Sequence, residues 1–266
     1  MDLEYSREQV ENRRLDLFLP EQDANGGCIL FIHGGGFSGG SRKQWRPVAE
    51  HFCKQGFVCV SAGYRLAPKW IFPSQLEDVR LAMAFVRSNA ERYGFSPSRI
   101  AAQGSSAGGY LVAMLATIQP GDSIGATPEL MIQDTRPNAA VCYCSVTTFR
   151  PWGGHGESVA QFLGKTEREA PELYRAASPQ DRVCGKEPPF LFLHGDADET
   201  VSVAHSVMMC NALRGAGGDA EVVLLPDVQH GYGYGVTTPA QLESVAHVGR
   251  FLRSRFCIPE PMPAAC

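Results

Sequence analysis

A serine flanked by glycines is the first residue whose surroundings suggest chemistry. Residues 104–108 read Gly-Ser-Ser-Ala-Gly, and Ser106, unlike Ser105, is the central position of a Gly-x-Ser-x-Gly pattern. In that pattern the serine lies on a sharp strand-to-helix turn, and small flanking residues leave room for the folded backbone. The following helix N-terminus favours developing negative charge. We therefore predict Ser106 as a nucleophile; an ordinary turn is the alternative unless other loops supply an acid, a base and oxyanion donors.

A glycine-rich loop is the predicted source of oxyanion donors. Residues 33–37 read His-Gly-Gly-Gly-Phe and follow an apolar run, residues 28–33, that is typical of a buried strand. Adjacent glycines let backbone N–H groups point inward, where two of them and the N–H of Ala107 could bind a tetrahedral oxyanion. Phosphate binding is the competing use of such a loop, but no Gly-Lys-Ser/Thr follows it.

The candidate acid comes from a carboxylate-rich segment. Residues 196–199 read Asp-Ala-Asp-Glu and follow the apolar run 190–194, in the order serine, acid, histidine that one class of hydrolases uses. Two of these three carboxylates could instead cap the helix that follows. We favour Asp198 as the acid, with Asp196 as the main alternative.

The candidate base is one of seven histidines. Only His230 follows the acid within a loop and has flexible glycine neighbours. His247 lies further downstream inside an amphipathic helical pattern, where a surface role is expected, and His194 ends a strand and is expected to order its own loop. Together with the serine, the glycines and the acid, His230 completes a nucleophile, base and acid arrangement.

Strands that alternate with helices must position these loops. The patterns predict strands at residues 14–20, 28–33, 57–62, 99–103, 139–144, 190–194 and 221–225, and helices at 44–55, 74–93, 109–118, 201–214 and 239–255. Ser74 and Glu77 fit a capping box at the start of the second helix. This alternation predicts an α/β fold with a mostly parallel sheet covered by helices on both faces. The four loops would then meet beyond the carboxyl ends of the strands.

Composition is consistent with one globular domain over residues 1–266. Hydrophobic residues make up 44% of the chain and charged residues 20%, and the net charge of −4 argues against nucleic acid or an anionic membrane as a partner. No signal peptide or apolar run of about 18 residues is present. The nine cysteines are read as reduced thiols of a cytoplasmic protein. The tail, residues 257–266, contains three prolines and is expected to be loosely held.

Taken together, these segments resemble the α/β-hydrolase-fold carboxylesterases that carry an HGGG-type oxyanion motif. The matching stretches are HGGGF (33–37), YRLAP (64–68), FPSQLEDV (72–79), GSSAGG (104–109), HGDADETV (194–201) and HGYG (230–233). The chain is most similar to hormone-sensitive-lipase-like esterases and to the smaller bacterial feruloyl and acetyl-xylan esterases. Only 32 residues precede His33, which leaves little room for the N-terminal helical cap of the former group and favours the smaller enzymes.

The resemblance implies a serine carboxylesterase that acts on short-chain or carbohydrate-linked acyl esters. It implies Ser106 as nucleophile, His230 as base, Asp198 as acid, and Gly35, Gly36 and Ala107 as oxyanion donors, with no metal or organic cofactor. The same motifs suit an amide hydrolase such as an arylformamidase or a peptidase. A non-catalytic binding protein is the third hypothesis, which retention of all three triad residues disfavours.

The substrate pocket is the least patterned part of the sequence. Residues 145–189 could form a small roof over the site. Within or near it, Phe37, Ser105, Phe149 and Trp152 are candidate substrate-binding residues, although core packing is an equal alternative for the aromatic rings.

Overall fold

An eight-stranded sheet forms the centre of the molecule. A computed structural model describes residues 1–5, 10, 12–21, 24–149 and 156–259. The strands lie in the order β1-β2-β4-β3-β5-β6-β7-β8, and only the pairings β1–β2 and β2–β4 are antiparallel. Their bounds are β1 Asp2–Glu4, β2 Arg14–Phe18, β3 Cys28–Ile32, β4 Val58–Ala62, β5 Ile100–Ser105, β6 Ala139–Tyr143, β7 Phe190–Gly195 and β8 Ala220–Leu225.

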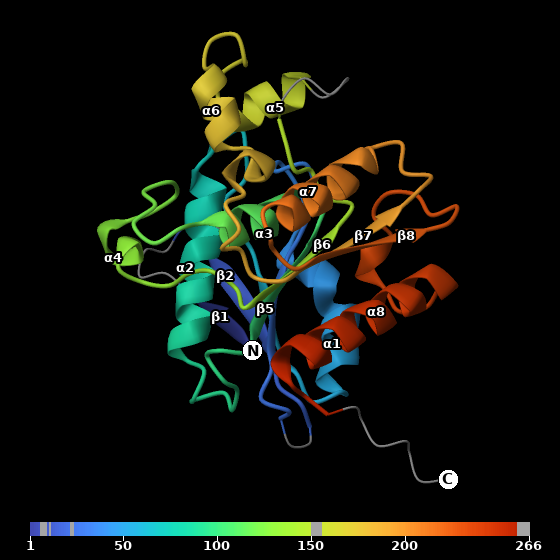
Figure 1. Cartoon of the computed structure of the whole chain (residues 1–266). Helices are drawn as coiled ribbons and strands as arrows, with labels where there is room; N and C mark the ends of the chain where they lie inside the picture. The colour runs from blue at the N-terminus through green and yellow to red at the C-terminus, as the bar shows by residue number, and fades with distance from the viewer. Residues whose placement is uncertain (6–9, 11, 22–23, 150–155, 260–266) are drawn as a thin grey trace.

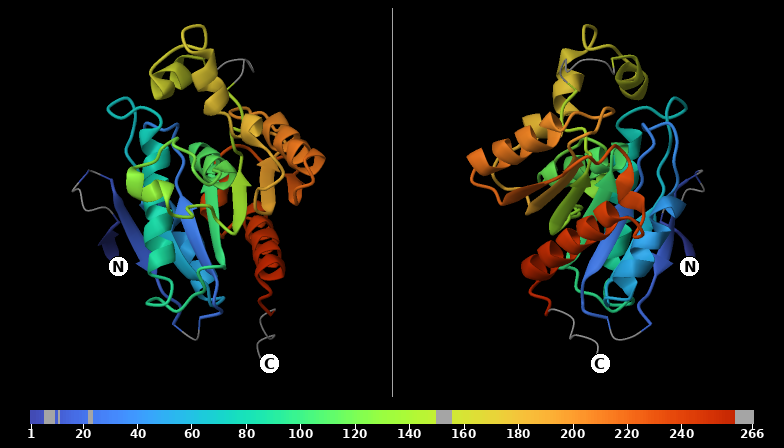
Figure 2. Two further views of the ribbon diagram at one scale, coloured as in Figure 1. Left: turned by 60° about the vertical axis from the view of Figure 1, so that its left-hand side comes forward. Right: turned by 90° about the vertical axis from the view of Figure 1, so that its right-hand side faces the viewer.

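Helices cover both faces of this sheet (Figures 1 and 2). The longer ones are α1 (Arg46–Cys53), α2 (Ser74–Ser88), α3 (Ala107–Thr117), α7 (Ala204–Gly215) and α8 (Pro239–Phe256). Shorter helices are α4 (Pro128–Met131), α5 (Gly156–Leu163) and α6 (Pro171–Ala176), with 3-10 turns η1 (Arg42–Trp45), η2 (Pro179–Arg182) and η3 (Tyr232–Tyr234). The predicted single-domain α/β-hydrolase fold is confirmed.

Alternation along the strands divides the buried side chains between two apolar cores. In β3, Leu30 and Ile32 pack with side chains of α2, α3 and α7. Ile29 and Phe31 point to the opposite face and pack with side chains of α1 and α8. Every residue of β3, β4, β5, β6 and β7 is buried. These strands therefore read as largely apolar runs, with Ser61, Gln103, Ser105 and His194 as their buried polar residues.

Four details differ from the sequence-based expectations. Ser74 is the first residue of α2 and Pro73 occupies the N-cap, so the predicted capping box at Ser74 is wrong. Helix α2 ends at Ser88 and not near residue 93. The short strand β1 was not predicted, because three residues carry too little pattern. The first residues of the tail, which was expected to be loosely held, are packed against the protein: Ile258 is buried and the Pro259 carbonyl accepts a hydrogen bond from Arg253. Residues 260–266 lie outside the described part.

Helices α5 and α6 come from the weakly patterned stretch and project from one end of the molecule (Figures 1 and 2). Helix α5 is anchored where the backbone N–H of Phe72 donates to the Phe162 carbonyl at 2.8 Å. The Phe162 ring also stacks on Phe37 in the glycine-rich loop, with centroids 3.8 Å apart. The roof remains a prediction, but α5 is joined to the loops at the carboxyl ends of the strands.

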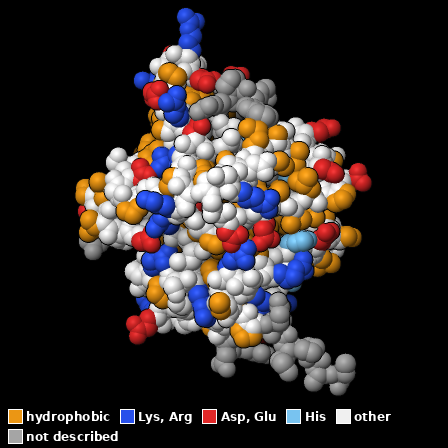
Figure 3. Space-filling model, viewed as in Figure 1, with side chains coloured by type: hydrophobic (Ala, Val, Ile, Leu, Met, Phe, Trp, Pro, Cys, Tyr) orange, Lys and Arg blue, Asp and Glu red, His pale blue; other side chains and the backbone are white. Residues whose placement is uncertain are grey.

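Charged side chains of both signs are interspersed over the face shown in Figure 3. This distribution accompanies the small net charge of −4. Among the described helices, none combines the length and the apolar character needed to cross a membrane.

A buried ion cluster fixes the loop between β4 and α2. Asp78 in α2 is fully buried and accepts hydrogen bonds from the Arg13 Nε at 2.7 Å and from the Arg65 backbone N–H at 2.7 Å. The Arg65 guanidinium also contacts Asp78 and lies 4.8 Å from the Trp70 ring centroid. Further along the same loop, the N–H of Ala67 donates to the Phe37 carbonyl at 2.9 Å. Because the ion cluster fixes the segment that contains Arg65 and Ala67, it also supports the glycine-rich loop to which Ala67 is hydrogen-bonded.

Replacing Asp78 by alanine should strongly destabilise the protein. Asp78→Ala leaves two nearly buried guanidinium groups with the partly exposed Glu77 as their shared carboxylate. Removing one partner of a buried ion pair costs up to about 3–5 kcal/mol. The exposed pair between Asp2 and Arg14 is the matched control, since Asp2→Ala should cost at most about 1 kcal/mol. Urea unfolding measures both changes. Equal, small losses in the two variants would contradict the structural role given to Asp78.

Candidate active site

Ser106 lies on a strained turn between β5 and α3. Its backbone has φ 55° and ψ −120°, outside the conformations that a side chain ordinarily allows. A Cβ at Gly104 would collide with the backbone of Gly108, and a Cβ at Gly108 would collide with the carbonyl groups of Ile32 and His33. The glycines of the Gly-x-Ser-x-Gly pattern are thus required by close backbone approach.

His230 joins Ser106 to Asp198 through two hydrogen bonds. Its Nδ1 lies 2.7 Å from Asp198 Oδ2, and its Nε2 lies 2.9 Å from Ser106 Oγ. A carboxylate can only accept, so Nδ1 carries the proton and Nε2 accepts from the serine hydroxyl. The structure therefore brings together the three predicted residues from the ends of β5, β7 and β8.

The carboxylate of Asp198 is anchored by its own loop. Its Oδ1 accepts hydrogen bonds from the backbone N–H groups of Thr200 at 2.9 Å and Val201 at 2.8 Å. Burial opposes ionisation, but the Val201 N–H, His230 and the Thr200 N–H outweigh it and lower the pKa of Asp198 below its usual value. Asp198 is thereby kept as an anion facing His230.

Asp196, the alternative acid, is engaged elsewhere. Its Oδ1 accepts a hydrogen bond from the backbone N–H of Asp227 at 2.7 Å. Nearby, the Ala197 N–H donates to the Val228 carbonyl at 3.2 Å, and a Cβ at Gly195 would collide with that same carbonyl. Asp196 therefore helps to hold the loop after β7 against the loop that carries His230.

The glycine-rich loop lies directly beside Ser106. A Cβ at Gly34 would be 2.7 Å from the Ser105 carbonyl oxygen and 3.3 Å from Ser106 Cβ. Gly35 and Gly36 have φ of 116° and 60°, and within the described residues neither of their N–H groups donates a backbone hydrogen bond. Ala107 is the first residue of α3, so its N–H has no partner within the helix. These are the three amides predicted to bind the oxyanion.

Two residues that the sequence analysis did not single out support this loop. The Tyr234 hydroxyl accepts a hydrogen bond from the Gly34 N–H at 2.7 Å, which ties the His230 loop to the glycine-rich loop. His33 is buried and stacks on Tyr64 with centroids 4.2 Å apart, and burial lowers the pKa of His33 to about 4. In the sequence, the Gly-Tyr pair that follows His230 is repeated at once, and this repeat was the one feature that could have drawn attention to Tyr234.

The candidate substrate residues fall into three groups. Ser105 has no exposed surface, so its side chain does not reach a substrate and we do not retain that expectation. Phe37 and Phe149 are nearly buried and belong to one aromatic cluster with Tyr110 and Phe162. Trp152 lies outside the described residues.

A cysteine and a histidine form a compact group with the acid of the triad. The ligand atoms of Cys144, His194 and Asp198 lie within 4.8 Å of one another, and Cys144 comes from a different strand end than the other two. Burial raises the pKa of the Cys144 thiol to about 12, so the thiol is protonated and a poor metal ligand. Asp198 and His194 already have hydrogen-bonding partners. We therefore assign no metal to this group.

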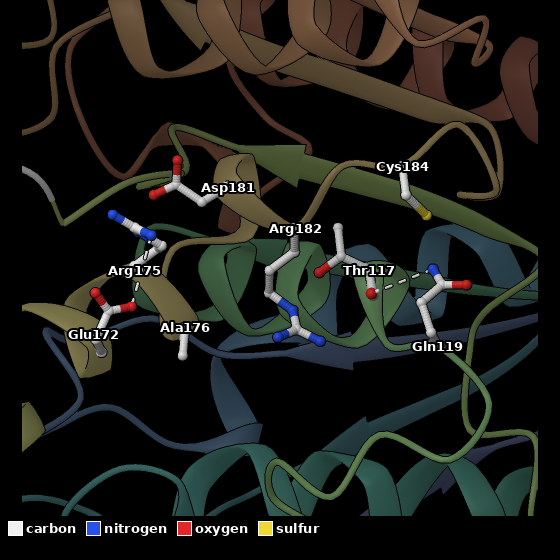
Figure 4. A pocket seen from close by; sticks show the side chains of 8 residues that line it. All are labelled: Thr117, Gln119, Glu172, Arg175, Ala176, Asp181, Arg182 and Cys184. Carbon is white, nitrogen blue, oxygen red and sulfur yellow. Dashed lines mark hydrogen bonds and ion pairs between the residues drawn. The ribbon is translucent and has the colours of Figure 1, made fainter.

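A pocket of about 320 Å³ lies elsewhere, and none of the triad residues lines it (Figure 4). Its guanidinium groups are already paired, Arg182 with Asp122 and Arg175 with Glu172 at 3.7 Å. Because these charges are compensated, the pocket presents no strong attraction for an ion. The lining residues are Thr117, Gln119, Glu172, Arg175, Ala176, Asp181, Arg182 and Cys184.

With this geometry established, comparison with known proteins identifies the family. The family model described as BD-FAE matches residues 15–213, most of the chain. The chain belongs to the BD-FAE family. The resemblance to esterases with the α/β-hydrolase fold is thereby confirmed.

Curated relatives of this BD-FAE protein carry esterase names. It is 31% identical to Esterase LipQ of Mycobacterium tuberculosis, over 82% of this chain and 53% of LipQ. It is 27% identical to an acetylxylan esterase of Xylanibacter ruminicola, over 92% of this chain and 48% of that protein. The chain thus spans about half the length of these relatives.

Solved structures of similar size share the fold along their whole length. Thermogutta terrifontis esterase 2 phosphonylated by sarin has a TM-score of 0.83 and 26% identity, with 98% of this chain and 96% of that chain covered. A truncated carbohydrate esterase from gut microbiota has a TM-score of 0.80 and 26% identity, with 96% and 94% covered.

Proposed function

We propose that this BD-FAE protein is a serine carboxylesterase that hydrolyses short-chain or carbohydrate-linked acyl esters through an acyl-enzyme. The observation that carries this proposal is the continuous hydrogen-bond chain from Ser106 Oγ through His230 to Asp198, at 2.9 Å and 2.7 Å. The esterase names of the relatives support the reaction class.

In the first half of the proposed reaction, His230 Nε2 takes the proton of the Ser106 hydroxyl while Oγ attacks the ester carbonyl carbon. Negative charge develops on the former carbonyl oxygen, and the amides of Gly35, Gly36 and Ala107 stabilise it. Asp198 stabilises the imidazolium form of His230. His230 then protonates the departing alcohol, which leaves the acyl group on Ser106.

In the second half, water takes the place of the alcohol. His230 accepts a proton from the water, and the resulting nucleophile attacks the acyl carbon through a second tetrahedral intermediate bound by the same amides. Collapse of this intermediate releases the acid and returns the proton to Ser106.

The aromatic cluster supports a preference for short acyl groups. Phe37 directly follows Gly36, and the Tyr110 N–H donates to the Ser106 carbonyl at 2.9 Å, so both rings originate next to the reacting atoms. Phe37 packs edge-on to Tyr110 with centroids 5.2 Å apart, and Tyr110 lies 4.8 Å from Phe149. Phe162 completes the cluster. Because these rings are at most 7% exposed, a long acyl chain would have to displace one of them.

Carbohydrate-linked esters are the second part of the proposed substrate class. One relative is named an acetylxylan esterase, and one solved neighbour is a carbohydrate esterase. An acetyl group on a sugar hydroxyl combines a small acyl part, which suits the aromatic cluster, with a large leaving alcohol.

Conservative changes at the triad test the proposed catalysis. Ser106→Ala should lower kcat for p-nitrophenyl acetate by at least about ten-thousandfold because it removes the nucleophile, and Asp198→Asn by a comparable factor because it removes the charge that orients and stabilises protonated His230. Asp196→Asn keeps an acceptor oxygen for the Asp227 N–H and is the matched control with near-normal kcat. Near-normal activity of Ser106→Ala, or a larger loss at Asp196 than at Asp198, would overturn the assignment.

A substrate panel then separates ester from amide hydrolysis. Acetylated xylan, methyl ferulate and N-formylkynurenine should be compared with simple p-nitrophenyl esters, each with Ser106→Ala as the blank. The proposal expects the highest kcat/KM on acetyl esters. A clear preference for N-formylkynurenine would instead support the amide hydrolase.

Opening the aromatic cluster should change acyl-chain preference. Phe149→Ala removes one ring beside Tyr110, and each methylene that gains burial contributes about 0.8 kcal/mol, so the octanoate-to-acetate ratio of kcat/KM should rise at least about tenfold. Phe95→Ala, a nearly buried phenylalanine just after α2, is the control and should leave the ratio unchanged. An unchanged ratio in Phe149→Ala would place the acyl group elsewhere.

A further inference from the structure

A second histidine lies behind the candidate acid. His194 is the penultimate residue of β7 and is fully buried. Its Nδ1 lies 2.8 Å from the Ser206 hydroxyl in α7, and its Nε2 lies 2.9 Å from the Val201 carbonyl oxygen. The same Nε2 lies 3.3 Å from Asp198 Oδ2, the oxygen that binds His230. The ring therefore bridges α7 and the acid loop.

The hydrogen-bonding partners fix the protonation of His194. Burial lowers its pKa, and the opposing effects of the Val201 carbonyl and Asp198 do not reverse this, so the ring is neutral at pH 7. A carbonyl oxygen can only accept, which places the single proton on Nε2. Nδ1 then accepts the hydrogen bond of the Ser206 hydroxyl. Asp198 Oδ2 thus faces an N–H from each of two histidines.

Two other titratable side chains near Asp198, Cys144 and Tyr232, are uncharged. Burial raises the pKa of Cys144 to about 12 and raises that of Tyr232 well above 10, so both are protonated at neutral pH. Asp198 is consequently the only anion among these groups. Its charge is divided between the backbone amides on Oδ1 and the two imidazoles on Oδ2.

We propose that His194 is a positioning residue for the catalytic acid and that Ser206 fixes its tautomer. The Nε2–H holds the Val201 carbonyl, and with it the turn whose N–H groups bind Asp198 Oδ1. It also takes up part of the charge on Oδ2, which limits how strongly Asp198 stabilises the protonated form of His230. This role rests on the proposed esterase function, because it acts through the triad.

Amide side chains separate the two nitrogen positions of His194. The amide nitrogen of glutamine reaches about the position of Nε2, whereas that of asparagine reaches about the position of Nδ1. His194→Asn therefore removes the donor that faces Asp198, and His194→Gln restores it. Ser206→Ala leaves the ring in place but removes the group that fixes its tautomer. His247→Asn on α8 is the control, because its side chain is partly exposed and lies 3.9 Å from Glu243.

The test is the pH profile of kcat and KM with p-nitrophenyl acetate for each variant. In His194→Asn, kcat should fall about tenfold to a hundredfold, with KM little changed, because the substitution removes both the hydrogen bond to the Val201 carbonyl and the 3.3 Å contact with the Asp198 carboxylate. The acid limb of kcat/KM should move to higher pH, since an unshared carboxylate stabilises the His230 cation more strongly. His194→Gln should restore most of kcat and most of the original position of the acid limb. Ser206→Ala should move the acid limb in the same direction as His194→Asn, but less far.

Several results would overturn the proposal. An acid limb that stays in place or moves to lower pH in both His194→Asn and Ser206→Ala contradicts it, as does a kcat that His194→Gln fails to restore. If His194→Asn does not fold, the proposal is judged on the acid limb of Ser206→Ala and on the kcat of His194→Gln. These outcomes can be told apart from failure of the proposed function. Wild-type protein without esterase activity would refute the proposed function, whereas active wild type with variants that behave normally would refute only the role of His194.

Discussion

The backbone at Ser106 is held at φ 55° and ψ −120°, and the arrangement of the site depends on that strained conformation. Such a residue costs of the order of 1–3 kcal/mol and persists only where its surroundings determine it. Here the surroundings are β5, in the middle of the sheet, and α3, whose eleven residues are all buried. The close approach of Gly108 to the end of β3 also sets the glycine-rich loop beside Ser106, so one backbone constraint positions both the hydroxyl and the amides.

Contacts between strand-end loops hold the remaining groups in place. The loop after β7 meets the loop after β8 at Gly195 and Val228, and the loop after β8 reaches the glycine-rich loop through Tyr234 and Gly34. Asp198 and His230 are therefore fixed relative to Ser106 by short loops on a rigid sheet. Preorganised donors of this kind are effective because they need little rearrangement as charge develops.

Much of this arrangement is predictable from the sequence. The buried strands appear as apolar runs, and the loops that follow them contain Ser106, Asp198 and His230 in a recognisable order.

Local rules fail where tertiary contacts decide the outcome. Ser74 has the composition of an N-cap but lies inside α2, and the predicted loose tail is packed at Ile258. His194 was expected to order its own loop, and its hydrogen bond to the Val201 carbonyl fits that expectation, whereas its contact with Ser206 depends on how α7 packs. Tyr234 binds Gly34 in a distant part of the chain, so no local spacing reveals that contact. The aromatic cluster is hidden for the same reason, because Phe37, Tyr110 and Phe162 come from three separate segments.

The central claim is that Ser106 is the nucleophile of an acyl-transfer site. Its most direct measurement is mass-spectrometric mapping of the protein after reaction with diethyl p-nitrophenyl phosphate, which traps activated serines. The account predicts one diethylphosphoryl group per chain, located on Ser106, with esterase activity lost in parallel and no labelling of Ser106→Ala. Labelling at another residue that tracks the loss of activity, or full activity in protein labelled at Ser106, would contradict it.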